Sequence, residues 1–140
     1  MNAPSDGGEV LYAGELEIRP REGLVLATGQ ALTLSVREFQ LLVAMARRAG
    51  TIVTRDELYR TVWSGELRAG DRSVDVYVSK LRGKLEGAMP DRRFIHTHPG
   101  FGYRFHPQLA PGVVTIEAED RVNEAAARHS QDLHIAAHGN

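Results

Sequence analysis

The stretch from Asp71 to Glu86, DRSVDVYVSKLRGKLE, restricts most strongly what this chain can fold into. On a helix with 3.6 residues per turn, Val74, Val78, Leu81 and Leu85 fall on one side, as in a helix that packs on a core. The opposite side carries small, cationic and aliphatic residues, namely Arg72, Val76, Ser79, Lys80 and Gly83. That second face fits either a solvated charged surface or a surface that enters the groove of a DNA duplex. The segments before and after this helix are needed to distinguish between these two interpretations.

Positive charge is concentrated around this stretch. Residues 68–110 include eight basic and four acidic residues, a net charge of +4, whereas the whole chain carries −1. Segments 1–34 and 111–140 carry −3 each. A basic block of this kind is typical of nucleic-acid binding, while the acidic flanks are also compatible with a role in solubility alone.

Composition excludes several classes of protein. The 140 residues suffice for one domain with a core. They contain no cysteine, no apolar run of membrane-spanning length and no secretory signal pattern, so we expect a cytoplasmic protein with no membrane contact. No nucleophile motif or phosphate loop frames a catalytic site, and His96, His98 and His106 are too few for a convincing metal site. We therefore predict no enzyme activity, no metal and no cofactor.

The N-terminal third reads as a leader followed by a small antiparallel sheet. Met1 to Gly8 are small, polar and turn-prone, and residues 10–18 and 24–34 have the patterns of strands, the latter folded at a hairpin turn over Thr28–Gln30. We predict a disordered leader over residues 1–9, a folded domain over 10–108 and an acidic, flexible tail over 109–140.

Two capping boxes mark the starts of two helices before the Asp71 stretch. Ser35 with Glu38 opens a helix that we expect to end near Arg48, and Thr54 with Glu57 opens one that ends near Trp63. A glycine-containing loop, Ser64 to Gly70, then leads to the third helix, which Asp71 or Ser73 can cap. Two helices joined by a loop, the second with a cationic outer face, are the outline of a helix-turn-helix.

A hairpin is expected directly after the third helix. Residues 86–91 contain Gly87 and Pro90 and read as a turn, and residues 92–97 and 103–105 read as strands on either side of the turn segment His98 to Gly102. The predicted fold is therefore α+β: a winged helix-turn-helix with an N-terminal antiparallel sheet, three helices and a C-terminal β-hairpin wing.

Four blocks in this order and spacing, LTLSVREFQLLVAMARRAG, TRDELYRTVW, DRSVDVYVSKLRGKLE and THPGFGYRF, carry a family resemblance. Together they resemble the effector domain of OmpR/PhoB-type response regulators, over roughly Val10 to Phe105. The resemblance implies sequence-specific binding of double-stranded DNA and regulation of transcription. It implies binding as a pair of copies on direct repeats, with the Asp71 helix in the major groove and a possible contact with RNA polymerase.

The resemblance also implies roles for individual residues. Arg72 would meet the phosphate backbone, Val76 would pack on a thymine methyl, and Arg82 and Lys84 would contact the backbone. Trp63 and Tyr103 match backbone-contacting positions of the family. The full set of expected DNA-contacting residues is Trp63, Arg72, Ser73, Val76, Tyr77, Ser79, Lys80, Arg82, Lys84, Thr97, His98 and Tyr103. The expected polymerase-contact loop comprises Ser64, Gly65, Glu66, Leu67 and Arg68.

Two positions depart from the family pattern. Pro99 occupies a wing position that is often basic, and His98 could replace that charge only when protonated, a minority state at neutral pH. Ser79 lies where many members place a base-contacting arginine, and one lost bidentate contact is worth roughly 1–3 kcal/mol of discrimination. We therefore expect a different operator, a lower affinity, or both.

Two alternatives stay open at the level of the sequence. Regulators of this type normally carry a receiver domain before the effector domain, so the chain is either a stand-alone regulator or an effector domain without its receiver. The modest net charge, Pro99 and the acidic tail also fit a winged helix that serves as a protein-interaction module with weak or no DNA binding.

Overall fold

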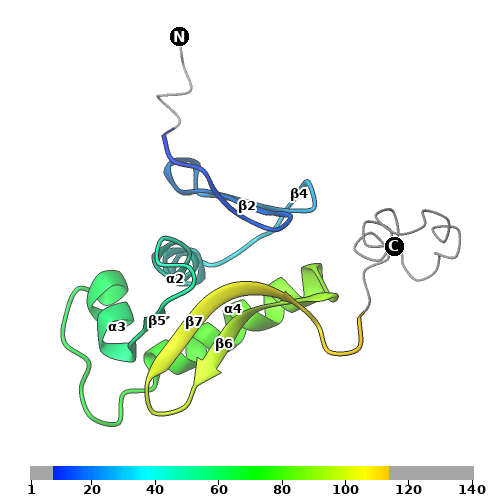
Figure 1. The fold of residues 1–140 in the computed structure, drawn as a ribbon. Helices are drawn as coiled ribbons and strands as arrows, with labels where there is room; N and C mark the ends of the chain where they lie inside the picture. Colours follow the sequence, from blue (N-terminus) through cyan, green and yellow to red (C-terminus); the bar gives the residue numbers. More distant parts are fainter. Residues whose placement is uncertain (1–7, 114–140) are drawn as a thin grey trace, which may run out of the picture. The chain divides into compact units, whose positions relative to one another are not determined.

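The computed structural model describes residues 8–113, so most of the predicted leader and the tail from residue 114 lie outside the described residues. The chain divides into two units, 1–108 and 109–140, and within residues 8–113 all helices and nearly all strand residues belong to the first. In that unit a four-stranded sheet is followed by three helices and a three-stranded sheet (Figure 1). The predicted winged-helix architecture is thereby confirmed.

The first sheet is an antiparallel meander of four short strands. These are β1 (Leu11–Ala13), β2 (Leu16–Arg19), β3 (Leu24–Ala27) and β4 (Gln30–Ala31), with the 3-10 helix η1 (Pro20–Glu22) between β2 and β3. The prediction of one strand over 10–18 was wrong, because Gly14 takes a left-handed backbone (φ 61°) and folds the segment into a hairpin in which Ala13 pairs with Leu16. The predicted turn at Thr28–Gln30 is present, although β4 is shorter than expected.

The three helices are α2 (Val36–Ala46), α3 (Arg55–Trp63) and α4 (Ser73–Ala88). Both predicted capping boxes form, with Ser35 accepting from the Glu38 amide and Thr54 accepting from the Glu57 amide. Helix α4 begins two residues later than expected. It also ends two residues later, so the predicted turn over 86–91 was wrong at its start. The helix continues through Gly87 because Met89 behind it is buried and extends the apolar stripe.

The C-terminal sheet has the order β5–β7–β6, with β5 (Ile52–Val53), β6 (Arg92–His98) and β7 (Gly102–Leu109). The hairpin of β6 and β7 is the predicted wing. Strand β5 was not predicted, since two residues carry no period that a sequence pattern can reveal. It pairs antiparallel with β7 through Val53 and Tyr103, which ties the base of the wing to the start of α3.

One core joins both sheets and the helices. Among its fully buried side chains are Leu16 and Ile18 of the first sheet, Leu41 and Leu42 of α2, and Phe94 and Phe105 of the wing, and the last two stack on each other. The stripe predicted for α4 lies in this core, with Val74, Val78, Leu81 and Leu85 each at most 1% exposed. The orientation of α4 is therefore fixed by its apolar face, and the opposite face is left at the surface.

Candidate nucleic-acid interface

The outer face of α4 is the most open part of the helix. Arg72, Ser79, Lys80 and Gly83 are exposed, and Val76 is 46% exposed. An exposed valine stabilises a helix little, so burial does not explain Val76. The structure thus places five residues of the predicted groove-facing stripe together on one accessible surface.

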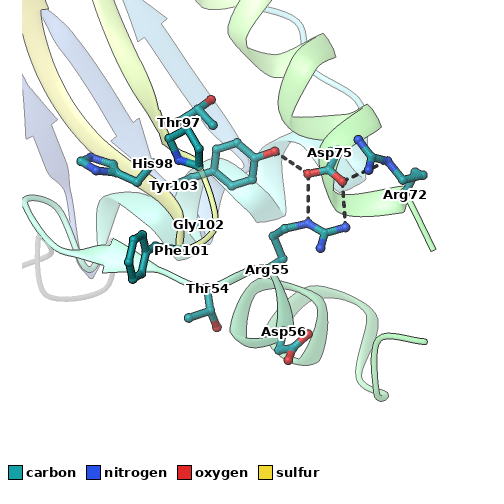
Figure 2. A pocket seen from close by; sticks show the side chains of 12 residues that line it. Thr54, Arg55, Asp56, Arg72, Asp75, Thr97, His98, Phe101, Gly102 and Tyr103 are labelled. Carbon is teal, nitrogen blue, oxygen red and sulfur yellow. Dashed lines mark hydrogen bonds and ion pairs between the residues drawn. The ribbon is translucent and has the colours of Figure 1, made fainter. Parts of the chain in front are cut away.

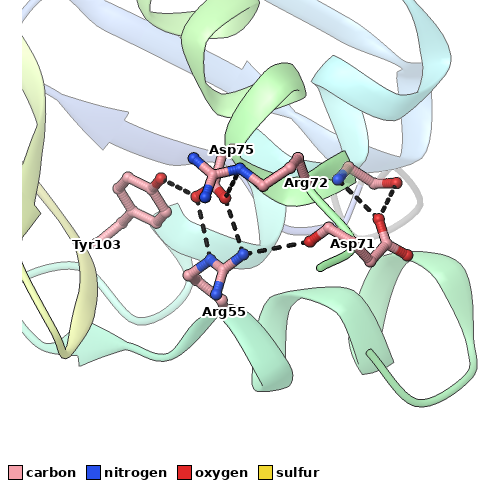
Figure 3. A network of polar contacts seen from close by, with 6 residues as sticks. Arg55, Asp71, Arg72, Asp75 and Tyr103 are labelled. Atoms are coloured by element: carbon pink, nitrogen blue, oxygen red, sulfur yellow. Dashed lines mark hydrogen bonds and ion pairs between the residues drawn. The ribbon is translucent and has the colours of Figure 1, made fainter. Parts of the chain in front are cut away.

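A polar network surrounds Asp75 at the first turn of α4 (Figures 2 and 3). Arg55 of α3 donates to both Asp75 carboxylate oxygens, from Nε at 3.1 Å and from Nη2 at 2.8 Å. The Tyr103 hydroxyl of the wing donates to Asp75 Oδ1, and Arg72 Nε lies 3.3 Å from Oδ2. Asp75 therefore joins α3, α4 and β7 at a single carboxylate.

The network changes the proton affinity of two of its members. Burial alone would raise the pKa of Asp75, but the hydrogen bonds from Tyr103 and Arg55 and the charges of Arg55 and Arg72 outweigh it and hold the pKa below its usual range. Burial, followed by the bond to Asp75, raises the pKa of Tyr103 to about 12. Asp75 is therefore ionised and Tyr103 protonated at neutral pH, as the hydrogen bonds require.

This geometry bears on two predicted phosphate contacts. The Tyr103 side chain is buried and uses its only proton on Asp75, so it has no proton left to donate to a phosphate. Arg72 has a side chain that is 72% exposed, and its remaining N–H groups stay available. Arg72 is the N-cap residue of α4 and makes no side-chain cap bond, so the prediction that Asp71 or Ser73 is the N-cap was wrong. Asp71 Oδ1 instead accepts from the Ser73 amide at 2.8 Å and from the Ser73 hydroxyl at 2.6 Å, and Ser73 is half-buried.

Lys84, another predicted backbone contact, is bound within the protein. Its Nζ donates at 2.7 Å to Glu38 Oε1, the same atom that accepts the Ser35 amide at 2.8 Å in the capping box of α2. Burial would raise the pKa of Glu38, but the Lys84 and Ser35 hydrogen bonds outweigh it and lower that pKa. The Glu38 side chain is only 4% exposed, so a phosphate that drew Lys84 away would leave a buried carboxylate poorly satisfied.

Three aromatic rings and two cations form a continuous cluster of side-chain contacts across the three helices. The rings of Tyr59 and Trp63 stack with centroids 5.2 Å apart, and Trp63 meets Tyr77 edge-on at 5.7 Å. Lys80 Nζ lies 5.0 Å from the centre of the Tyr77 ring, and Arg37 Cζ lies 5.1 Å from that of Trp63. Trp63, Tyr77 and Lys80, which were predicted separately, thus belong to one surface cluster.

The wing and the starts of α3 and α4 enclose a hollow of about 540 Å³. Arg55, Arg72, His98 and Phe101 are among its lining residues (Figure 2). Phe101 at the wing tip is 71% exposed. Gly102 beneath it has a φ of 149°, and a Cβ there would overlap the Val53 carbonyl oxygen, so only glycine lets the wing sit this close to β5.

Two cations, Arg82 of α4 and Arg104 of β7, contact neutral side chains of the wing. Arg82 of α4 donates to the Thr97 hydroxyl at 2.8 Å, which brings two predicted contact residues together. Arg104 Nε donates to His98 Nε2 at 3.2 Å, and this bond requires the neutral imidazole at that nitrogen. Arg104 therefore places a positive charge beside His98 in the wing.

Sequence reasoning missed three residues of this surface: Arg37, Phe101 and Arg104. The position of Arg37 could not be predicted from the sequence because its partners, Val62 and Trp63, lie on another helix. Phe101 was counted as part of a turn, although a large apolar residue at a hairpin tip was a usable signal. The predicted polymerase-contact loop, Ser64 to Arg68, lies at the surface between α3 and α4 with only Leu67 half-buried.

Other kinds of site have little support in the part of the chain that the structure describes. Within residues 8–113, no three His, Asp or Glu side chains come together as a metal-binding group. Every helix in the same range is too short or too polar to cross a lipid bilayer.

The fold and this surface define a winged helix of the helix-turn-helix type. Residues 29–105 match the family model described as "Transcriptional regulatory protein, C terminal". The chain is 36% identical over 99 residues to the DNA-binding response regulator MtrA of Mycolicibacterium smegmatis, an alignment that covers 71% of this chain and 43% of MtrA. This chain therefore belongs to the family of C-terminal domains of transcriptional regulatory proteins, and its relatives are OmpR/PhoB-type response regulators.

Two experimental structures resemble this one closely. The crystal structure of the Klebsiella pneumoniae RstA DNA-binding domain in complex with the RstA box matches with a TM-score of 0.64 and 34% identity, covering 70% of this chain and 97% of that one. The crystal structure of the DNA-binding domain of CpxR from E. coli matches with a TM-score of 0.65 and 29% identity, covering 71% and 97%. The matched part of the chain thus spans nearly the whole of these two DNA-binding domains and under half the length of the curated relative MtrA.

Proposed function

We propose that this chain regulates transcription by binding double-stranded DNA sequence-specifically, with α4 in the major groove. The observation that carries the proposal is the division of α4 into one fully buried face and one exposed face bearing Arg72, Val76, Ser79 and Lys80. A major groove about 12 Å wide admits one helix, and the buried face fixes which side chains the helix would present to it.

The exposed residues divide into two expected roles. Val76 suits the C5-methyl group of thymine, and Lys80 and Ser79 suit hydrogen-bond acceptors on base edges. Arg72 at the start of the helix suits the phosphate backbone, which positions the protein without reading sequence. Thr97 of the wing and Arg82 of α4 are hydrogen-bonded to each other and would contact the backbone as a pair, and Arg104 adds a further cation in the wing.

The other partners in this proposal rest on the family. Binding as two copies on direct repeats, contact of the Ser64–Arg68 loop with RNA polymerase and a cytoplasmic location are all consistent with a regulator of this type. A role in binding rather than catalysis is consistent with the family as well. The folded domain of the proposal covers residues 10–108.

The test is selection of bound duplexes from a random pool with the full chain, followed by affinity measurements on the selected site at several salt concentrations. We expect one enriched site and an affinity that falls steeply with salt, with a log–log slope of about −0.9 for each phosphate contacted. No enrichment and no measurable affinity at low salt would contradict the proposal and favour a protein-interaction module.

A further inference from the structure

We propose that Arg37, in the first turn of α2, is an additional phosphate-binding residue that extends the DNA interface beyond the helix-turn-helix. The inference rests on the proposed function, because it concerns the same interface. It assigns a binding role to a residue that lies outside α3, α4 and the wing.

Arg37 is held in a defined position by neutral groups. Its Nη1 donates at 2.7 Å to the carbonyl oxygen of Val62 in the last turn of α3 and at 3.2 Å to Gln40 Oε1. Its guanidinium lies over the Trp63 ring, an arrangement that suits the planar, weakly hydrated arginine head group. The side chain is therefore placed in advance, which reduces the entropy lost when it binds an anion.

The charge of Arg37 is not cancelled by these contacts. Arg47, Arg48 and Arg55 each lie within 3.3 Å of a carboxylate oxygen, whereas Arg37 forms no ion pair within residues 8–113. The adjacent Glu38 points inward to Ser35 and Lys84 and so does not neutralise it. A guanidinium fixed in place without a counter-charge is suited to a phosphate, which it can bind through two parallel N–H groups.

Arg37 is also continuous with the proposed reading surface. Lys80 Nζ lies 5.0 Å from the centre of the Tyr77 ring, and the Tyr77 and Trp63 ring centres are 5.7 Å apart. Arg37 Cζ lies 5.1 Å from the centre of the Trp63 ring. An interface that includes Lys80 can therefore extend over the Tyr77 and Trp63 rings to Arg37.

A purely structural role predicts different behaviour. The bond to Val62 satisfies a carbonyl at the C-terminal end of α3, where helix carbonyls lack intrahelical partners, and glutamine can make the same bond without charge. Arg37→Gln therefore separates the two roles, and Arg37→Lys keeps the charge while losing the planar fork. Arg21→Gln, on η1, is the control for removal of one exposed positive charge away from the three helices.

The experiment measures affinity for the selected duplex against salt concentration, together with the thermal midpoint of each full-length variant. For Arg37→Gln we expect affinity to fall about tenfold, the log–log slope to become shallower by about 0.9, and the selected sequence to stay the same. Arg37→Lys should keep the wild-type slope, and so should Arg21→Gln.

Two results would overturn the inference, and they are distinguishable. If wild-type protein binds with a steep slope and Arg37→Gln has the same slope and affinity, Arg37 serves only to cap α3, and the proposed function stands. If the wild-type chain itself binds no duplex at low salt, the proposed function falls and this inference falls with it.

Discussion

Charged side chains at the two ends of helix α4 are paired with opposite charges, whereas the lysine in its middle contacts an aromatic ring. At the first turn Asp75 collects donors from Arg55, Arg72 and Tyr103, and near the last turn Lys84 is bound to the buried Glu38. Between them Val76, Ser79 and Lys80 are exposed, and Lys80 rests on an aromatic ring rather than on a carboxylate. The ends fasten the helix to α2, α3 and the wing, while the middle keeps its chemistry available to a ligand.

The difference shows that a basic residue on a recognition-type helix is not by itself a DNA contact. Each carboxylate that anchors α4 accepts several hydrogen bonds, which is how buried charges are normally tolerated. A cation that satisfies such a carboxylate is costly to remove from it. The comparison therefore predicts that changes at Asp75 and Lys84 alter stability and that changes in the middle of the helix alter recognition.

The largest expected effect is at the N-terminal end, for Asp75→Ala. Removing the carboxylate leaves the Arg55 guanidinium and the Tyr103 hydroxyl without their acceptor, and we expect a loss of about 2 kcal/mol in the free energy of unfolding. Urea unfolding at pH 7 measures it. Asp56→Ala, an exposed acid in the first turn of α3, is the control and should cost well under half as much. Equal losses for the two variants would show that the Asp75 network does not anchor the helix.

The next effect is at the C-terminal end, for Lys84→Met, and it depends on pH. We expect a loss of about 1–2 kcal/mol at pH 7, because the buried Glu38 carboxylate loses its cationic partner. The lowered pKa of Glu38 means that this carboxylate contributes stability above its ordinary value of 4.5 and loses it as the pH falls through the lowered folded-state value. The difference between wild type and Lys84→Met should therefore shrink below about pH 4.5.

Lys80→Met is the matched control for Lys84→Met, since it removes an exposed lysine from the same helix. It should change stability by no more than about 0.5–1 kcal/mol, the value of its cation–π contact with Tyr77, but weaken DNA binding and flatten its salt dependence. Lys84→Met should do the reverse. A flattened salt dependence for Lys84→Met would restore Lys84 as a phosphate contact, as the family resemblance implies.

A smaller effect is expected at Tyr77, in the middle of the helix. If its ring positions Lys80, Tyr77→Phe should bind like wild type, and Tyr77→Leu should lose a cation–π contact worth about 0.5–1 kcal/mol together with part of the preference at the base pair that Lys80 reads. Competition binding with single-base variants of the selected site measures this. Equal losses for Phe and Leu would instead indicate that the Tyr77 hydroxyl contacts the DNA directly.

Local signals made most of the fold predictable from sequence. The capping boxes at Ser35 and Thr54 and the stripe from Val74 to Leu85 act within one or two helical turns, so the chain itself displays them. The engagement of Lys84 by Glu38 and of Arg37 by Val62 joins residues that are distant in sequence. A periodic sequence pattern cannot predict such pairs. These pairs determine which cations of the predicted site are available to bind DNA.

The pairing of β5 with β7 has a consequence for the order of folding. Val53 and Tyr103 meet only after the chain between them, which includes α3, α4 and β6, has been brought together. Closing so long a loop is entropically unfavourable until the helices have packed. The helical core is thus expected to form before the wing is fastened. Substitutions at the Val53–Gly102 contact should then accelerate unfolding more than they slow folding.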